Sequence, residues 1–81
     1  MDMDQIMTVE HLDITGEVCP MTFVRTRLAL DRLASGALLQ VRLRGEEPLR
    51  NVSANALSLG HALLAMRTLD DGSTVLEIRR R

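Results

Sequence analysis

Hydrophobic and polar residues follow two different periods along the chain, and these periods predict strands and helices in a fixed order. Alternation with a period of two predicts strands over residues 9–14, 37–44 and 74–80, and Leu39, Val41 and Leu43 give the clearest case. Apolar residues spaced three and four apart predict helices over residues 20–34 and 46–59. Residues 61–69 also indicate a strand, because the turn "DDGS" that follows is typical of a hairpin. The register of this strand stays open, since "ALLAM" does not alternate.

The order β-α-β-α-β-β predicts an α/β (α+β) fold, a two-layer sandwich. We expect a four-stranded mixed sheet whose one face is covered by both helices, because the strands are half polar. The stripe Phe23, Leu30, Leu33 and Ala34 is expected to form the core side of the first helix. Residues 9–80 then form a single domain, and residues 1–8 are expected to be a flexible N-terminus.

Composition and charge narrow the class of function. The chain has 81 residues, 46% of them hydrophobic, and Phe23 is its single aromatic residue. Ten basic and eleven acidic side chains nearly cancel, so no strong field attracts nucleic acid or a membrane surface. Without Trp or Tyr the chain lacks stacking platforms, and we expect no direct sequence-specific contact with nucleic acid. One cysteine cannot form an internal disulfide and no secretory signal precedes the domain, which favours a cytoplasmic protein.

The single cysteine, Cys19, lies in the stretch "GEVCPMT" between a predicted strand and a predicted helix. Proline is favoured at the first position of a helix, so Pro20 would make Cys19 the N-cap. Pro20, Met21 and Thr22 then form a helix N-terminus that favours thiolate over thiol. An unpaired cysteine is more often a small buried core residue. The arrangement of glycine turn, cysteine, proline and helix shifts the interpretation towards a nucleophile.

The run "LDITGEVCPMTFVRTRLALDRLASGALLQV" resembles the TusA/SirA-like sulfur-carrier family, whose signature is a strand, a glycine and Cys-Pro-x-Pro opening a helix. "LGHALLAM" is similar to the Gly-His step of that family. The resemblance implies the same β-α-β-α-β-β sandwich, with no cofactor and no metal. It further implies that Cys19 accepts a persulfide sulfur from a donor, such as a cysteine desulfurase or a rhodanese-type protein. An acceptor sulfurtransferase would then take the sulfur for tRNA thiolation, cofactor maturation or sulfur metabolism.

The sequence departs from the family signature at Thr22, which replaces the second proline. Counted from an N-cap at Cys19, Thr22 would be the third helical residue, whose backbone N–H commonly bonds to the N-cap side chain. A proline has no such N–H group. Thr22 restores this N–H group and adds a hydroxyl. We therefore hypothesise that Cys19 is at least as acidic here as in a Cys-Pro-x-Pro carrier and that its persulfide is held more firmly.

A second stripe on the first helix, formed by Met21, Val24 and Leu28, is a candidate docking surface for partners. Arg25 and Arg32 flank it and would add electrostatic steering. Packing of Leu28 against the neighbouring helix is the alternative for this stripe, and solvated surface is the alternative for the arginines. We expect a monomer.

Two other functions fit the same residues: a non-catalytic regulatory module that uses this stripe, and a redox sensor with one cysteine. His11 and His61 lack metal-ligand spacing with Cys19, and a structural or surface role is expected for both. His61 would assist proton transfer if the fold brought it close to Cys19.

Overall fold

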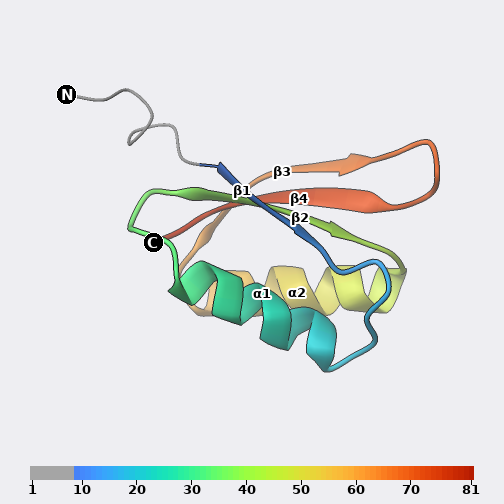
Figure 1. Ribbon diagram of the computed structural model, residues 1–81, viewed down its shortest axis with the longest axis horizontal. Coiled ribbons are helices and arrows are strands. Elements are labelled where there is room, and N and C mark those ends of the chain that lie inside the picture. Colours follow the sequence, from blue (N-terminus) through green and yellow to red (C-terminus); the bar gives the residue numbers. More distant parts are fainter. Residues whose placement is uncertain (1–8) are drawn as a thin grey trace.

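The computed structural model describes residues 9–81 and contains the six predicted elements in the predicted order. They are β1 (Val9–Asp13), α1 (Met21–Asp31), β2 (Leu38–Leu43), α2 (Glu46–Ser58), β3 (Ala62–Thr68) and β4 (Thr74–Arg79). The strand order is β1-β2-β4-β3, with β1 and β2 parallel and the other neighbours antiparallel. Both helices lie on one side of the sheet (Figure 1). The predicted fold class is confirmed, whereas the predicted flexible terminus, residues 1–8, lies outside the described residues.

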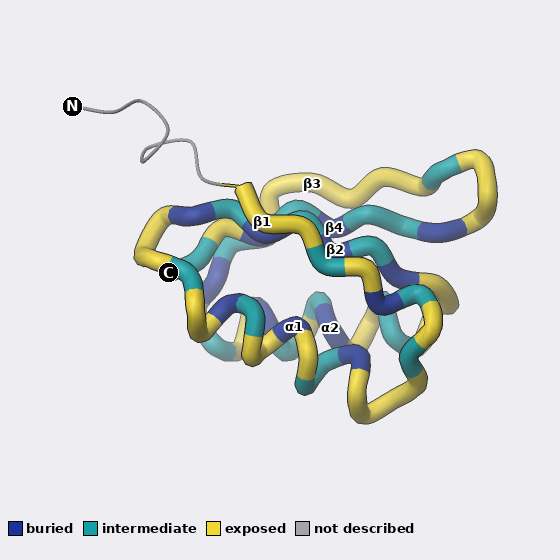
Figure 2. Tube along the Cα trace, viewed as in Figure 1, coloured by how far each residue is buried: buried dark blue, intermediate teal, exposed yellow. Residues whose placement is uncertain are grey.

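The core lies between the sheet and the two helices, where the buried parts of the chain face one another (Figure 2). On the central strands β2 and β4, the alternating pattern correctly predicted which residues belong to the core. The inward residues of β2 and β4 and the inward stripe of α2 are almost completely buried: Leu39, Val41, Leu43, Leu76, Ile78, Val52 and Ala56. The core is thus aliphatic, and the half-buried Phe23 packs against its edge.

The core face of α1 differs from the predicted stripe. Thr22, Thr26 and Leu30 are the buried residues of this helix, whereas Phe23 is only partly buried and Ala34 is exposed beyond the helix end. Burial of Thr26 is tolerated because its hydroxyl donates to the Thr22 carbonyl oxygen at 2.8 Å. Leu30 belongs to the predicted stripe, and Phe23 and Leu33 pack against the core, so the prediction was wrong in including Ala34 and in missing the two buried threonines.

The bounds of α1 also differ, because the helix runs over residues 21–31 and not 20–34. At its start the Val24 N–H donates to the Pro20 carbonyl oxygen at 3.1 Å, so Pro20 is the N-cap and Met21 the first helical residue. At its end the Arg32 and Leu33 N–H groups bond three residues back, which tightens the last turn and stops the helix.

A β-bulge in β3 explains why residues 61–69 do not alternate. Leu63 pairs with Ile78 and Ala65 pairs with Glu77, so Leu64 is one extra residue on this strand. The residues after it change face relative to a regular strand. The irregular hydrophobic pattern of residues 61–69 therefore follows from this bulge in the pairing of β3 with β4.

Asp71 organises the turn between β3 and β4. It accepts hydrogen bonds from the backbone N–H and the hydroxyl of Ser73 at 2.9 and 2.6 Å, and it forms an ion pair with Arg42 from β2. The hydrogen bonds from Ser73, followed by that from Arg42, hold the pKa of Asp71 well below its usual range. Asp13 caps the turn after β1 in the same way through Thr15. These carboxylates fix the loops at one end of the sheet.

Candidate functional site

Cys19 lies in the loop between β1 and α1, and its side chain is exposed. The Met21 N–H donates to the Val18 carbonyl oxygen at 2.8 Å, which closes a turn around Cys19 and Pro20. The prediction that Cys19 is the N-cap was wrong by one residue, because helical bonding begins at the Pro20 carbonyl. Thr22 is accordingly the second helical residue. The expected capping hydrogen bond from its backbone N–H to the Cys19 sulfur is not formed.

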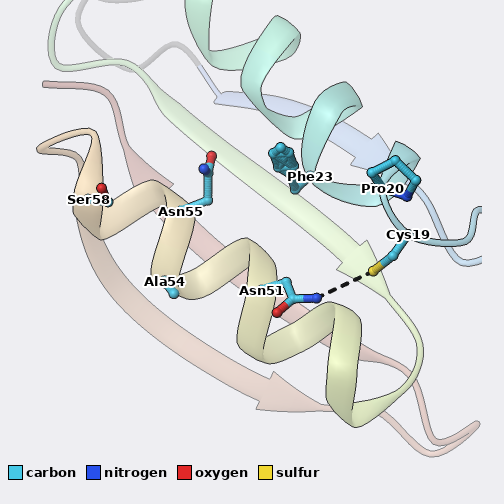
Figure 3. Close-up of a pocket in the computed structure, with 7 residues that line it drawn as sticks. All are labelled: Cys19, Pro20, Phe23, Asn51, Ala54, Asn55 and Ser58. Atoms are coloured by element: carbon cyan, nitrogen blue, oxygen red, sulfur yellow. Dashed lines mark hydrogen bonds between the residues drawn. The ribbon is translucent and has the colours of Figure 1, made fainter.

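Two polar side chains contact the sulfur in place of the expected backbone group. The hydroxyl of Thr22 lies 3.4 Å from Sγ, and Nδ2 of Asn51 donates to Sγ at 3.5 Å. Thr22 is 1% exposed, so its hydroxyl is held in place by the packing of α1. Asn51 belongs to α2 and reaches across to the loop (Figure 3). Both groups can donate to an anionic sulfur, which is the form that reacts as a nucleophile.

A groove of about 460 Å³ opens beside the sulfur, between α1 and α2. Cys19, Pro20 and Phe23 line it on one side and four α2 residues on the other: Asn51, Ala54, Asn55 and Ser58 (Figure 3). The α2 residues are spaced i, i+3, i+4 and i+7 and form one stripe. This stripe was not predicted. Its signal in the sequence is a row of small and neutral polar residues beside the apolar core stripe of the same helix.

The predicted docking stripe lies on the outer surface of α1. Met21 and Leu28 are 43% and 53% exposed and Val24 is partly buried, so packing of Leu28 into the helix interface is wrong. Arg25 forms an ion pair with Glu17 at 2.7 Å. Nε of Arg32 donates to the Leu28 carbonyl oxygen at 3.4 Å. The role of these five residues in docking stays a prediction.

His61 has a structural role at the far end of α2. It is 6% exposed, and its Nδ1 accepts the Arg81 backbone N–H at 3.0 Å. Burial, together with the charges of Arg80 and Arg81, lowers the pKa of His61. Asn51 lies in the first half of α2 and Ser58 about 10 Å further along the helix, so His61 is separated from the sulfur by most of the groove. Proton transfer between His61 and Cys19 is therefore not supported.

His11 is exposed on the outer face of the sheet. Across residues 9–81, three or more His, Cys, Asp or Glu side chains do not gather into a group that could hold a metal ion. Over the same residues the helices are too short or too polar to cross a membrane.

Comparison with known proteins places these features in a family. The family model described as sulfurtransferase TusA matches residues 10–80, which is nearly the whole domain. The chain belongs to the TusA family. A protein of Archaeoglobus fulgidus described as "Putative sulfur carrier protein" is 35% identical over 77 residues, 95% of this chain and 88% of that protein. A Bacillus subtilis protein, "Putative sulfur carrier protein YrkI", is 40% identical over 53 residues, 65% of this chain and 71% of the relative.

The solved structure of a SirA-like protein from Desulfitobacterium hafniense has the same fold. Its TM-score is 0.79 at 23% identity, over 89% of this chain and 96% of that chain. The predicted resemblance to the TusA/SirA-like family is confirmed. Membership of the TusA family implies that the protein interacts with sulfur-donor and sulfur-acceptor proteins.

Proposed function

We propose that the protein is a sulfur relay in which Cys19 carries the sulfur as a persulfide. The observation that supports this proposal best is the position of Sγ. It is exposed to an approaching protein, and it lies within hydrogen-bond distance of Thr22 and Asn51. A cysteine that served only as packing would be buried in apolar surroundings.

Each transfer is an exchange between sulfur atoms without net oxidation. The Cys19 thiolate attacks the outer sulfur of a donor persulfide, R–S–SH. A bond forms between Sγ and that sulfur, the S–S bond of the donor breaks, and its electron pair leaves with the donor thiolate. The proton stays on the transferred sulfur or dissociates to water. In the second step an acceptor thiolate attacks the same outer sulfur, and Cys19 leaves as the thiolate.

Thr22 and Asn51 support both steps by donating hydrogen bonds to the sulfur that carries negative charge. Cys19 is the attacking anion in the first transfer and the leaving anion in the second, so one pair of hydrogen-bond donors serves both. In the loaded form the outer sulfur lies about 2 Å from Sγ, and the groove beside Sγ has room for it.

The proposed sulfur donor is a cysteine desulfurase or a rhodanese-type protein, and the proposed recipient is an acceptor sulfurtransferase. The candidate destinations of the sulfur are tRNA thiolation, cofactor maturation and sulfur metabolism. The exposed thiol would oxidise readily, so we place this activity in a reducing compartment such as the cytoplasm.

Intact-mass measurement tests the proposal. The reduced protein is incubated with a cysteine desulfurase and cysteine, or with a rhodanese and thiosulfate, and its mass is measured before and after reductant. We expect the gain of one sulfur atom that reductant removes and that Cys19→Ser abolishes. No gain with either donor would refute the proposal. A mixed disulfide with glutathione, in place of a sulfur gain, would support the redox sensor.

A further inference from the structure

The contact between α1 and α2 is incomplete on one side. Where two helices cover a sheet side by side, their facing residues normally pack with large apolar side chains. Here α2 presents Asn51, Ala54, Asn55 and Ser58 opposite Pro20 and Phe23 of the α1 segment (Figure 3). These α2 side chains are too small or too polar to fill the interface, and the groove of about 460 Å³ results.

The lining of this groove is uncharged and partly unpaired. None of the seven lining residues is Asp, Glu, Lys, Arg or His. Among the seven, the hydrogen bond drawn in Figure 3 is that from Asn51 to Cys19, and it uses only the Nδ2 end of the Asn51 carboxamide. Oδ1 of Asn51, the Asn55 carboxamide and the Ser58 hydroxyl are not paired with one another. The groove thus offers hydrogen-bond acceptors and donors beside the apolar side chains of Pro20, Phe23 and Ala54.

The spacing of these polar groups matches an extended polypeptide. Asn51 and Asn55 are four helical residues apart, or about 6 Å along the axis. Residues on the same side of an extended chain repeat every two positions, or about 6.6 Å. The whole stripe from Asn51 to Ser58 spans about 10 Å, the length of three extended residues.

We propose that the groove between α1 and α2 binds a short, extended and uncharged segment of a partner protein, the segment that carries the cysteine exchanging sulfur with Cys19. The inference rests on the sulfur-relay function proposed above. Asn51 and Asn55 bond to backbone amides of the segment, and small apolar side chains of the segment face Phe23 and Ala54. The groove begins at Sγ, the atom that every sulfur-exchanging cysteine must reach. A charged small thiol such as glutathione would bring carboxylates into a lining without cations, which disfavours it.

A chromogenic exchange reaction tests this binding directly. The probe is the peptide acetyl-Ala-Ser-Ala-Cys-amide with its cysteine activated as the 2-thiopyridyl disulfide, and the reference is acetylcysteine amide activated in the same way. Cys19 attacks the probe cysteine, a new S–S bond to Sγ forms, and the bond to the pyridyl sulfur breaks. The released pyridine-2-thione is followed by absorbance. The ratio of peptide rate to reference rate removes differences in the intrinsic reactivity of the thiol.

We expect the peptide to react with saturation kinetics and, at low concentration, about tenfold faster than the reference, the effect of one or two hydrogen bonds. Ala54→Arg, which introduces bulk and charge into the groove, should bring the ratio close to one. Leu57→Arg is the matched control, because Leu57 is exposed on the same helix and does not line the groove. It should keep the wild-type ratio. Asn55→Leu, a milder change, should lower the ratio about fivefold.

Equal rates for peptide and reference in the wild type, or equal ratios in Ala54→Arg and Leu57→Arg, would overturn the groove proposal. Preference for activated glutathione over the neutral peptide would also overturn it and would identify a small-thiol site. Desulfurase loading of the same variants separates the two proposals. If Cys19 never gains sulfur, the relay function fails. If Ala54→Arg gains sulfur from the desulfurase as fast as Leu57→Arg, the groove proposal alone fails.

Discussion

Thr22→Val removes one of the two contacts to the sulfur while keeping the shape of the buried side chain. The hydroxyl lies 3.4 Å from Sγ and is fixed in a site that is 1% exposed, so valine can occupy the same space. A hydrogen bond of this kind contributes about 1 kcal/mol to the stability of the charged sulfur, and part of this effect on the rate is offset because a sulfur anion without the hydrogen bond is the stronger nucleophile. We therefore expect the alkylation of Cys19 by iodoacetamide, and its loading with sulfur by a desulfurase, to slow about two- to threefold at neutral pH.

Thr26→Val is the matched control for this experiment. Thr26 lies one turn further along α1, is 3% exposed, and donates its hydroxyl to the Thr22 carbonyl oxygen and not to the sulfur. The same substitution there should leave the alkylation rate unchanged, and circular dichroism should show that both variants keep the fold. If Thr22→Val reacts as fast as Thr26→Val, the hydroxyl does not stabilise the anion, and the advantage assigned to Thr22 over the motif proline is lost.

Three further predictions concern stability. The lowered pKa of His61 means that the unfolded chain binds more protons in mildly acidic solution, so urea midpoints should fall between about pH 7 and pH 5, and His61→Asn should flatten that slope. The lowered pKa of Asp71 stabilises the fold above about pH 4 and loses this effect on further acidification; Asp71→Asn should weaken the acid sensitivity, and an unchanged acid titration of the melting temperature would contradict this. Gly60→Ala should cost about 1–2 kcal/mol in chemical denaturation, because φ is +91° and the new Cβ would lie 2.9 Å from Cδ of Arg81. Gly16→Ala is the control, since a Cβ there meets nothing within 4 Å, and equal losses in the two variants would refute the argument.

The sequence was sufficient for the fold wherever one physical rule dominated. Leu39, Val41 and Leu43 alternate on a central strand that is buried on one face, and burial decides their orientation. The start of α1 was harder to predict, because two rules of helix capping compete there. Pro20 suits the first helical position, but helical bonding starts from its carbonyl, which makes it the N-cap and displaces Cys19 by one residue.

The candidate site was only half predictable for a related reason. Cys19 is marked by its local context, and Thr22 lies close to it in sequence. Asn51 is 32 residues away from Cys19, and only the packing of α2 beside α1 brings its carboxamide to the sulfur. The groove was missed because sequence periodicity emphasises apolar stripes, whereas Asn51, Ala54, Asn55 and Ser58 form a stripe of small and polar residues.

The bulge at Leu64 has a consequence for the behaviour of the protein in solution. Strand β3 is an edge of the sheet and most of its residues are exposed, so a regular β3 would present a long row of unpaired backbone groups to a second molecule. The extra residue shifts the spacing of those groups and increases the local twist, so that another strand cannot pair along the full edge. The β3 edge is thereby protected against pairing with a strand of another molecule along its whole length.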